Sequence, residues 1–122
     1  MRVTRIMRWT IYAVLLVLLV CYLQNARLRA TANHCTRHKS DNSTYVAEQC
    51  VIDYWKGLVT VRLRIFRNGE DTVLAERTYT ADEKILDWDL NGKAVYYGIE
   101  ASDGDSIALP PSRLDRLRAV LP

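Results

Sequence analysis

The first 32 residues of the sequence contain no acidic residue, although the whole chain has 14. They contain five arginines and therefore carry a formal charge of +5, whereas residues 33–122 hold 12 basic and 14 acidic residues and are net negative by two charges. The excess of positive charge in the chain therefore lies in its N-terminal segment. A nucleic-acid-binding domain carries excess positive charge on its docking surface, so this distribution argues against nucleic-acid binding.

Histidine is also scarce, since the chain has only His34 and His38. A catalytic triad with a histidine base would have to use one of them, close to the N-terminal segment, which is a poor place for a buried triad. The sequence has no glycine-rich phosphate-binding loop. Asp87 and Asp89 could act as paired carboxylates, but alternate residues of a strand are more typical of a solvated face. We therefore expect a protein that is not an enzyme and that has no cofactor or small-molecule substrate.

What the N-terminal segment does have is a long uncharged run, from Trp9 to Leu23, behind the basic residues 1–8. Its 15 residues would span about 22 Å as a helix at ~1.5 Å per residue. A bilayer core of about 30 Å usually takes ~20 apolar residues, and the apolar core of a signal peptide has about 7–15. The run therefore predicts either an uncleaved signal anchor over residues 9–23 or a signal peptide that is cleaved near Ala32.

The position of the alanine-containing cleavage motif favours the anchor. Ala30-Thr31-Ala32 lies well beyond the apolar run, and two arginines separate them. The N-terminal flank has the denser group of arginines, and positive charge stays on the cytoplasmic side of a membrane. We therefore expect a single-pass inner-membrane protein with a cytoplasmic N-terminus and a periplasmic C-terminal domain; the alternative is a secreted protein.

Residues 24–44 are polar and lack periodicity, so we expect a juxtamembrane linker there and a small exported β-rich domain over residues 45–122. Residues 45–56 fit either a capped helix or a strand, with a strand favoured in the second half. Residues 58–67 alternate apolar and polar side chains, which predicts a half-buried strand. Residues 72–80 return as its hairpin partner.

A second hairpin is expected from residues 85–90 and 93–100, because Asn91-Gly92 between them is a strong signal for a two-residue turn. Leu86, Trp88 and Leu90 are expected on its apolar face. A short last strand, with the sequence SIAL, follows.

The C-terminal residues predict a short helix, because Ser112 and Asp115 have the spacing of a capping box. Its leucines, which we expect to pack on the sheet, are Leu114, Leu117 and Leu121. The predicted fold class is α+β, mainly β, with an N-terminal hydrophobic helix, a small antiparallel sheet of two hairpins (about four to six strands) and a short C-terminal helix.

Cys35 and Cys50 lie in the polar segment together with both histidines. Four such residues could ligate a metal, but their spacing is not the paired spacing of a zinc finger. An exported domain this small gains from a covalent cross-link, and Cys21 lies inside the apolar run. We therefore expect a Cys35–Cys50 disulfide and no metal. Between these cysteines, Asn42 begins an N-glycosylation acceptor pattern, which also fits a polar turn.

Charged and aromatic side chains make the second hairpin the expected partner-binding surface. Residues 82–105 hold seven acidic residues against two lysines, whereas residues 56–67 are basic and contain no acid. Acids around aromatic side chains offer a partner a charged rim and an apolar anchor; the alternative is that the aromatics are core and the acids only solubilise. The candidate partner-binding residues are Asp87, Trp88, Asp89, Tyr96, Tyr97, Asp103 and Asp105.

The layout of a short anchor, an oxidised linker and a small β-rich domain resembles several classes of bacterial envelope protein. These include immunity proteins that neutralise periplasm-targeted toxins and inhibitors of wall-degrading enzymes. The resemblance implies a membrane-anchored exported protein that binds a protein partner in the cell envelope, as an immunity protein or inhibitor. The alternative hypothesis is a structural single-pass subunit of an envelope or secretion assembly, in which the anchor helix itself packs on partners.

Overall fold

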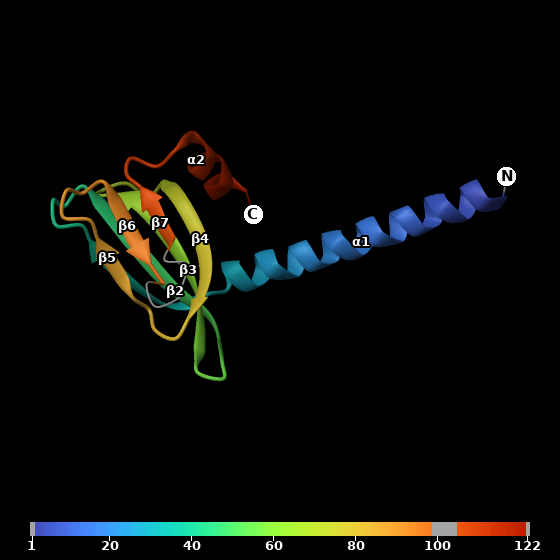
Figure 1. The fold of residues 1–122 in the computed structure, drawn as a ribbon, viewed down its shortest axis with the longest axis horizontal. Coiled ribbons are helices and arrows are strands. Elements are labelled where there is room, and N and C mark those ends of the chain that lie inside the picture. Colours follow the sequence, from blue (N-terminus) through green and yellow to red (C-terminus); the bar gives the residue numbers. More distant parts are fainter. Residues whose placement is uncertain (1, 99–104, 122) are drawn as a thin grey trace. The chain divides into compact units, whose positions relative to one another are not determined.

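The computed structural model describes residues 2–98 and 105–121 and divides the chain into two compact units (Figure 1). The first unit, Met1–Thr31, is helix α1, Arg2–Ala30. Its segment Val3–Ala30 is long and apolar enough to cross a membrane, as an anchor or as a signal sequence. The second, Ala32–Pro122, is called the β-rich unit below.

In the described part of the β-rich unit, seven strands form two antiparallel sheets and one short helix follows them. The larger sheet has the order β1 (Asn33–Lys39), β2 (Tyr45–Trp55), β3 (Leu58–Arg67) and β4 (Val73–Ala81). The smaller sheet has the order β5 (Leu86–Trp88), β6 (Ala94–Tyr97) and β7 (Asp105–Ala108). Helix α2 is Arg113–Val120. The chain is therefore α+β and mainly β, as the sequence predicts.

The core lies between the two sheets, and Figure 1 shows β5–β7, in orange and red, over the green and yellow strands of the larger sheet. The alternation predicted in residues 58–67 is confirmed, because Val61, Leu63 and Ile65 are fully buried. Burying one such side chain stabilises the fold by roughly 1.5–3 kcal/mol. Leu63 and Ile65 belong to a core cluster of buried side chains, which also contains Tyr45, Ala47, Ala75, Val95, Tyr97, Ile107 and Leu109.

Strand β1 corrects the prediction of a linker over residues 24–44. Residues up to Ala30 continue α1, and Asn33–Lys39 pair antiparallel with β2. All seven residues of β1 are exposed, because β1 is an edge strand and no core covers either of its faces. An edge strand of this kind needs no apolar alternation, and its polar sequence is therefore indistinguishable from a linker. Residues 45–56, left open between helix and strand, form β2 along almost their whole length.

The two hairpins of the prediction are confirmed, but the turn of the second differs from it, and a further hairpin joins β2 to β3. Asn91-Gly92 belongs to a longer turn, in which the Gly92 N–H donates to the Asp89 carbonyl at 2.8 Å, and only Gly92 of this pair has a positive φ, +67°. A Cβ on Gly92 would stand 2.7 Å from Asn42 Nδ2, so glycine is required there. The two-residue turn is instead Lys56-Gly57, with φ of 51° and 83°, as in type I′ turns.

Helix α2 begins as predicted, with Ser112 as its N-cap and a complete capping box with Asp115. The prediction that its leucines pack on the sheet is wrong, since Leu114, Leu117 and Leu121 are 56%, 60% and 55% exposed. The helix is attached to β4 through the buried Asp115, so an ion pair takes the place of the expected apolar face.

Candidate functional site

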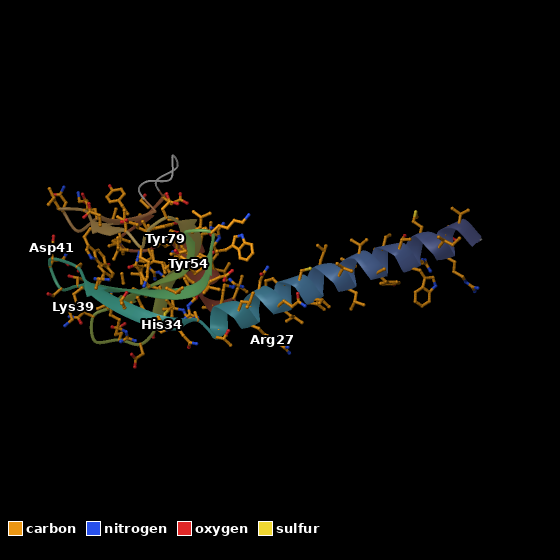
Figure 2. All side chains as sticks on the ribbon, turned by 90° about the horizontal axis from the view of Figure 1, so that it is seen from below. Arg27, His34, Lys39, Asp41, Tyr54 and Tyr79 are labelled. Carbon is orange, nitrogen blue, oxygen red and sulfur yellow. A yellow bond between two sulfur atoms is a disulfide. The ribbon has the colours of Figure 1, made fainter. Side chains whose placement is uncertain are left out.

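Three turns meet at one end of the β-rich unit, which we call the distal end because β1 enters the sheet from α1 at the other end. They are residues 40–44, 68–72 and 89–93. The Asn68 N–H donates to the Thr44 carbonyl at 2.9 Å, and Gly92 packs against Asn42. Figure 2 shows Lys39 and Asp41 at this end and His34 and Tyr54 toward the opposite one.

The first hollow of the distal end has a volume of about 300 Å³. Trp88, which also packs against the core, and Asp89 line it together with the turn of residues 40–42. Leu90 lies on its rim and is 94% exposed; the prediction that Leu90 shares the apolar face of Leu86 and Trp88 is therefore wrong. The strand ends at Trp88, and the turn that follows carries Leu90 outward. The hollow thus presents an apolar side chain beside two carboxylates, Asp41 and Asp89.

Asn42 helps to hold this hollow in shape. Its carboxamide oxygen accepts hydrogen bonds from Ser40 Oγ at 2.7 Å and from the Thr44 N–H at 3.1 Å. Such bonds from an asparagine to its own turn are typical of an Asx turn. The Asn42 side chain is therefore hydrogen-bonded within its own polar turn. A polar turn is the alternative that the sequence offered to a glycosylation acceptor.

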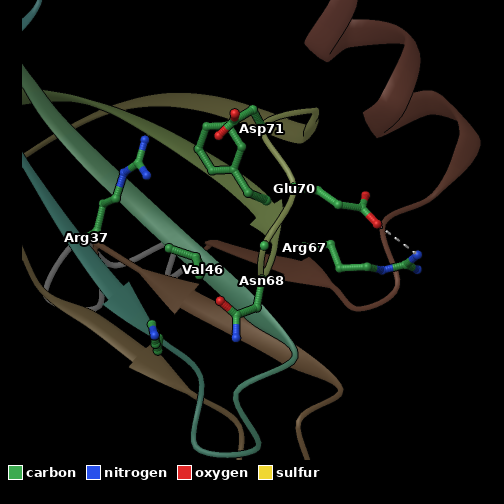
Figure 3. Close-up of a pocket in the computed structure, with 9 residues that line it drawn as sticks. Arg37, Val46, Arg67, Asn68, Glu70 and Asp71 are labelled. Atoms are coloured by element: carbon green, nitrogen blue, oxygen red, sulfur yellow. Dashed lines mark ion pairs between the residues drawn. The ribbon is translucent and has the colours of Figure 1, made fainter.

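A second hollow of about 280 Å³ lies on the other side of the distal end (Figure 3). The Arg37 guanidinium lies 5.6 Å from the centre of the Phe66 ring, a distance that suits a cation–π contact. Arg67 Nη1 lies 3.9 Å from Glu70 Oε1 across the turn. The hollow is lined by Arg37, Lys39, Val46, Phe66, Arg67, Asn68, Gly69, Glu70 and Asp71. Sequence reasoning missed it, because its residues come from three strands and the β3–β4 turn and share no local motif.

The other predicted partner-binding residues do not form one surface. Asp87 and Tyr96 are paired across β5 and β6 and are exposed. Tyr97 is only 3% exposed and belongs to the core, while Asp105 begins β7. Asp103 lies outside the described residues. The structure thus brings Trp88 and Asp89 to the distal hollow, places Asp87 and Tyr96 on the outer face of the smaller sheet, and turns Tyr97 inward.

Tyr97 belongs instead to a polar cluster that joins α2 to the sheets. Burial raises the pKa of Tyr97, and the nearby Asp105 carboxylate adds to that rise. Its ring lies 4.9 Å from that of Tyr79, whose hydroxyl accepts a hydrogen bond from Gln49 at 2.8 Å and whose pKa burial also raises. Arg77 hydrogen-bonds Tyr97 and donates to the carboxylate of Asp115.

The carboxylate of Asp115 accepts hydrogen bonds from Arg77 and from Ser112. Burial by itself would raise its pKa, but the hydrogen bonds from Arg77 and Ser112 outweigh burial and hold the pKa below its usual value. Ser112 Oγ donates to it at 2.8 Å. Asp115 therefore serves at once as the N3 residue of the α2 capping box and as the ionic partner of Arg77 on β4.

A row of alternating charges crosses the outer face of the larger sheet. Arg37, Glu48, Arg64 and Glu76 lie opposite one another on β1, β2, β3 and β4. Arg37 Nε lies 2.9 Å from Glu48 and Arg64 Nε lies 3.0 Å from Glu76. The acid-free basic stretch of residues 56–67 thus meets carboxylates from neighbouring strands, so the sequence overstates how basic this surface is.

Double-mutant cycles with alanine should rank the two ion pairs of this row. We expect the Arg64–Glu76 pair, whose side chains are 31% and 12% exposed, to have the larger coupling energy, about 1 kcal/mol. The Arg37–Glu48 pair should give about half of that, since Arg37 is 62% exposed and solvent screens it. Urea unfolding of the wild type, the four single variants and the two double variants measures both values. Equal coupling energies would show that burial does not set the strength of these pairs.

The disulfide Cys35–Cys50 is formed and links directly paired residues of β1 and β2. Among the described residues, the group that could hold a metal ion is Cys35, Glu48 and Cys50, with ligand atoms within 4.8 Å of one another. A metal needs thiolates, and both sulfurs are used in the disulfide. His34 and His38 are exposed on β1 and are not part of this group.

The candidate site is therefore the distal end, with its two hollows and the exposed Leu90 between charged side chains. It is assembled from turns that are far apart in the sequence and lies at one end of a sandwich whose larger sheet has a disulfide between β1 and β2. No protein-family model matches the chain, and no curated protein or solved structure is significantly similar to it.

Proposed function

We propose that this protein is a membrane-anchored exported binding protein whose distal end contacts a protein partner in the cell envelope. Helix α1 supports the membrane anchor by its length and apolar composition. The Cys35–Cys50 disulfide supports an oxidising compartment for the β-rich unit. The tether enters at one end of the sandwich, which leaves the distal end available to a partner.

The observation that carries the proposal is the exposure of Leu90 on the rim of the distal hollow. Among the large apolar side chains of the described residues, Leu90 is the most exposed, at 94%. It lines this hollow together with Asp41, Asp89 and Trp88. An apolar anchor with a charged rim is the usual composition of a protein-binding surface.

Within this class, an immunity protein or inhibitor fits the construction of the distal end. A blocking protein binds well when its contact residues are held in place before binding, because little ordering entropy is then lost. Gly92 packs against Asn42, and Asn68 donates to Thr44, so the turns brace one another. The proposed partner is a protein with an apolar pocket and basic residues around it.

Photocrosslinking from the distal end tests the proposal directly. With a photoreactive amino acid at position 90 in the full-length chain, we expect a discrete cross-linked partner in envelope membranes. The matched control carries the same group in place of Leu117, which is also exposed but lies on α2. Asp89→Lys should abolish the crosslink by reversing a rim charge. Equal crosslinking from both positions would contradict a binding surface at the distal end.

Exchanging the anchor separates this proposal from the alternative, a structural subunit whose membrane helix packs on partners. Residues 1–32 are replaced by an unrelated membrane anchor, so that the domain remains tethered. A binding protein that works through its distal end should retain the position-90 crosslink. Loss of the crosslink, with the β-rich unit still folded, would favour the structural subunit.

A further inference from the structure

The tip of the β2–β3 hairpin, residues 54–58, exposes aromatic side chains that no part of the described chain covers. Tyr54 and Trp55 are 67% and 68% exposed, and Leu58 is 41% exposed. The ammonium of Lys56 lies 5.8 Å from the Trp55 ring centre. A group of exposed apolar side chains with a polar rim marks a contact surface for a partner or a membrane. Neither the distal end nor the core accounts for this group.

The backbone holds the hairpin tip in one shape. Trp55 and Leu58 are paired, and Lys56 and Gly57 form the two-residue turn between them with φ of 51° and 83°. A lysine in the left-handed region is uncommon, and asparagine or glycine would adopt this conformation more easily. The sequence thus places a cation at the apex of the hairpin at a conformational cost.

The strand register places this tip at the end of the sheet where the chain arrives from α1. Asn33, the first residue of β1, pairs with Val51, and β2 runs on to Trp55. Four further residues at ~3.3 Å each carry the tip about 13 Å past the start of β1. Figure 2 shows Tyr54 and His34 both toward the end of the β-rich unit that is opposite Asp41.

The helix is long enough to bring this tip back to a membrane surface. The apolar run of α1 ends at Leu23, and the helix continues to Ala30, which adds about 10 Å at ~1.5 Å per residue. Asn33 follows Ala30 by three residues and is therefore within about 11 Å of it. The chain between Leu23 and Asn33 therefore spans about 21 Å at most, and the hairpin tip extends about 13 Å past the start of β1, so these lengths permit the tip to meet a membrane surface.

We propose that the hairpin tip binds the surface of the lipid bilayer beside α1, an inference that rests on the anchoring part of the proposed function. Tryptophan and tyrosine are enriched at the membrane interface, and one lysine near an anionic surface contributes about 1 kcal/mol. Trp55 and Tyr54 occupy the headgroup layer, and Lys56 meets lipid phosphates. Asp53 lies at the base of the tip, where its carboxylate accepts the Tyr54 N–H at 2.8 Å. The second contact orients the distal end away from the membrane.

Tryptophan fluorescence tests the contact of the hairpin tip with lipid. The full-length chain is placed in nanodiscs made of phosphatidylcholine and phosphatidylglycerol. The variant Trp9→Phe/Trp88→Phe keeps Trp55 as its only tryptophan. We expect its emission to shift to shorter wavelength in nanodiscs relative to detergent and to lose most of its quenching by iodide. Lipids brominated near the glycerol end of the acyl chain should quench it. The matched control is Trp9→Phe/Trp55→Phe/Trp88→Phe/Leu90→Trp, whose reporter at the distal end should remain open to iodide.

The outcomes separate the tip from the anchor. The chain could elute with the nanodiscs while iodide quenches Trp55 as strongly as the tryptophan at position 90. That result would overturn the lipid contact of the hairpin tip but not the membrane anchor. If the chain does not elute with the nanodiscs, both are wrong. A shift that appears in detergent and grows with protein concentration would assign the tip to self-association and overturn the lipid contact.

Discussion

Removing the Cys35–Cys50 disulfide is expected to lower the free energy of unfolding of the β-rich unit by about 3 kcal/mol, since the cross-linked residues are 15 apart. For a domain of this size each kcal/mol corresponds to about 4–8 °C in Tm, so Cys35→Ala/Cys50→Ala should melt roughly 12–24 °C lower. Small domains bury little surface, so this loss is a large part of a total stability of about 5–15 kcal/mol. Urea unfolding of the full-length chain in detergent measures it.

The free thiol at Cys21 offers the control for this experiment. Cys21→Ala should leave the unfolding curve of the β-rich unit unchanged, and a reductant should destabilise it and the wild type equally. The double variant should be insensitive to reductant. A double variant with wild-type stability would mean that the pairing of β1 with β2 is sufficient without the covalent link.

Replacing Asp115 is expected to have the second largest effect. Asp115→Ala removes half of the capping box and leaves Arg77, which is 23% exposed, without its carboxylate. A lost cap costs about 1 kcal/mol, and breaking a partly buried ion pair adds to that, so a loss of about 2–3 kcal/mol is expected. Leu117→Ala, on the exposed side of the same helix, is the matched control and should change stability by less than about 0.5 kcal/mol.

The pH dependence of stability provides an independent measurement of the same contact. The pKa of Asp115 is lowered in the folded protein, so the unfolded chain binds its proton more readily as the pH falls. The stabilisation is therefore complete above the unfolded pKa of about 3.9 and is lost as the pH falls from there through the folded value. Asp115→Asn should be less stable than the wild type at neutral pH, and the difference should shrink in acid. A constant difference would show that the charge of Asp115 is not what matters.

The sequence predicts those elements whose signal is local. Period-two alternation identifies β3 because its alternate residues Val61, Leu63 and Ile65 face a core, and the Ser112/Asp115 spacing identifies the start of α2. Strand β1 escapes prediction because an edge strand with both faces exposed has no reason to alternate. The only hint of β1 in the sequence is the predicted pairing of Cys35 with Cys50, which lies in a segment that the sequence left open between helix and strand.

The candidate site was harder to predict than the fold. Alternation along β5 does place Asp87 and Trp88 on opposite sides, but it cannot show that the turns of residues 40–44 and 68–72 meet the β5–β6 turn. That meeting depends on contacts between residues distant in the sequence, such as Asn42 with Gly92. The expected leucine face of α2 failed for a similar reason, because helical spacing identifies an apolar stripe but not the surface that covers it.

The edge position of β1 also has a mechanical consequence. The chain passes from α1 into β1 within a few residues, so, under the proposed function, a pull between the anchor and a partner at the distal end would load β1 along its length. The hydrogen bonds between β1 and β2 would then share the load, and the Cys35–Cys50 bond lies near the point where force enters the sheet. Only Asn33 and His34 precede that covalent link in the strand. Tension can therefore separate no more than these two residues from β2 before it meets a covalent bond.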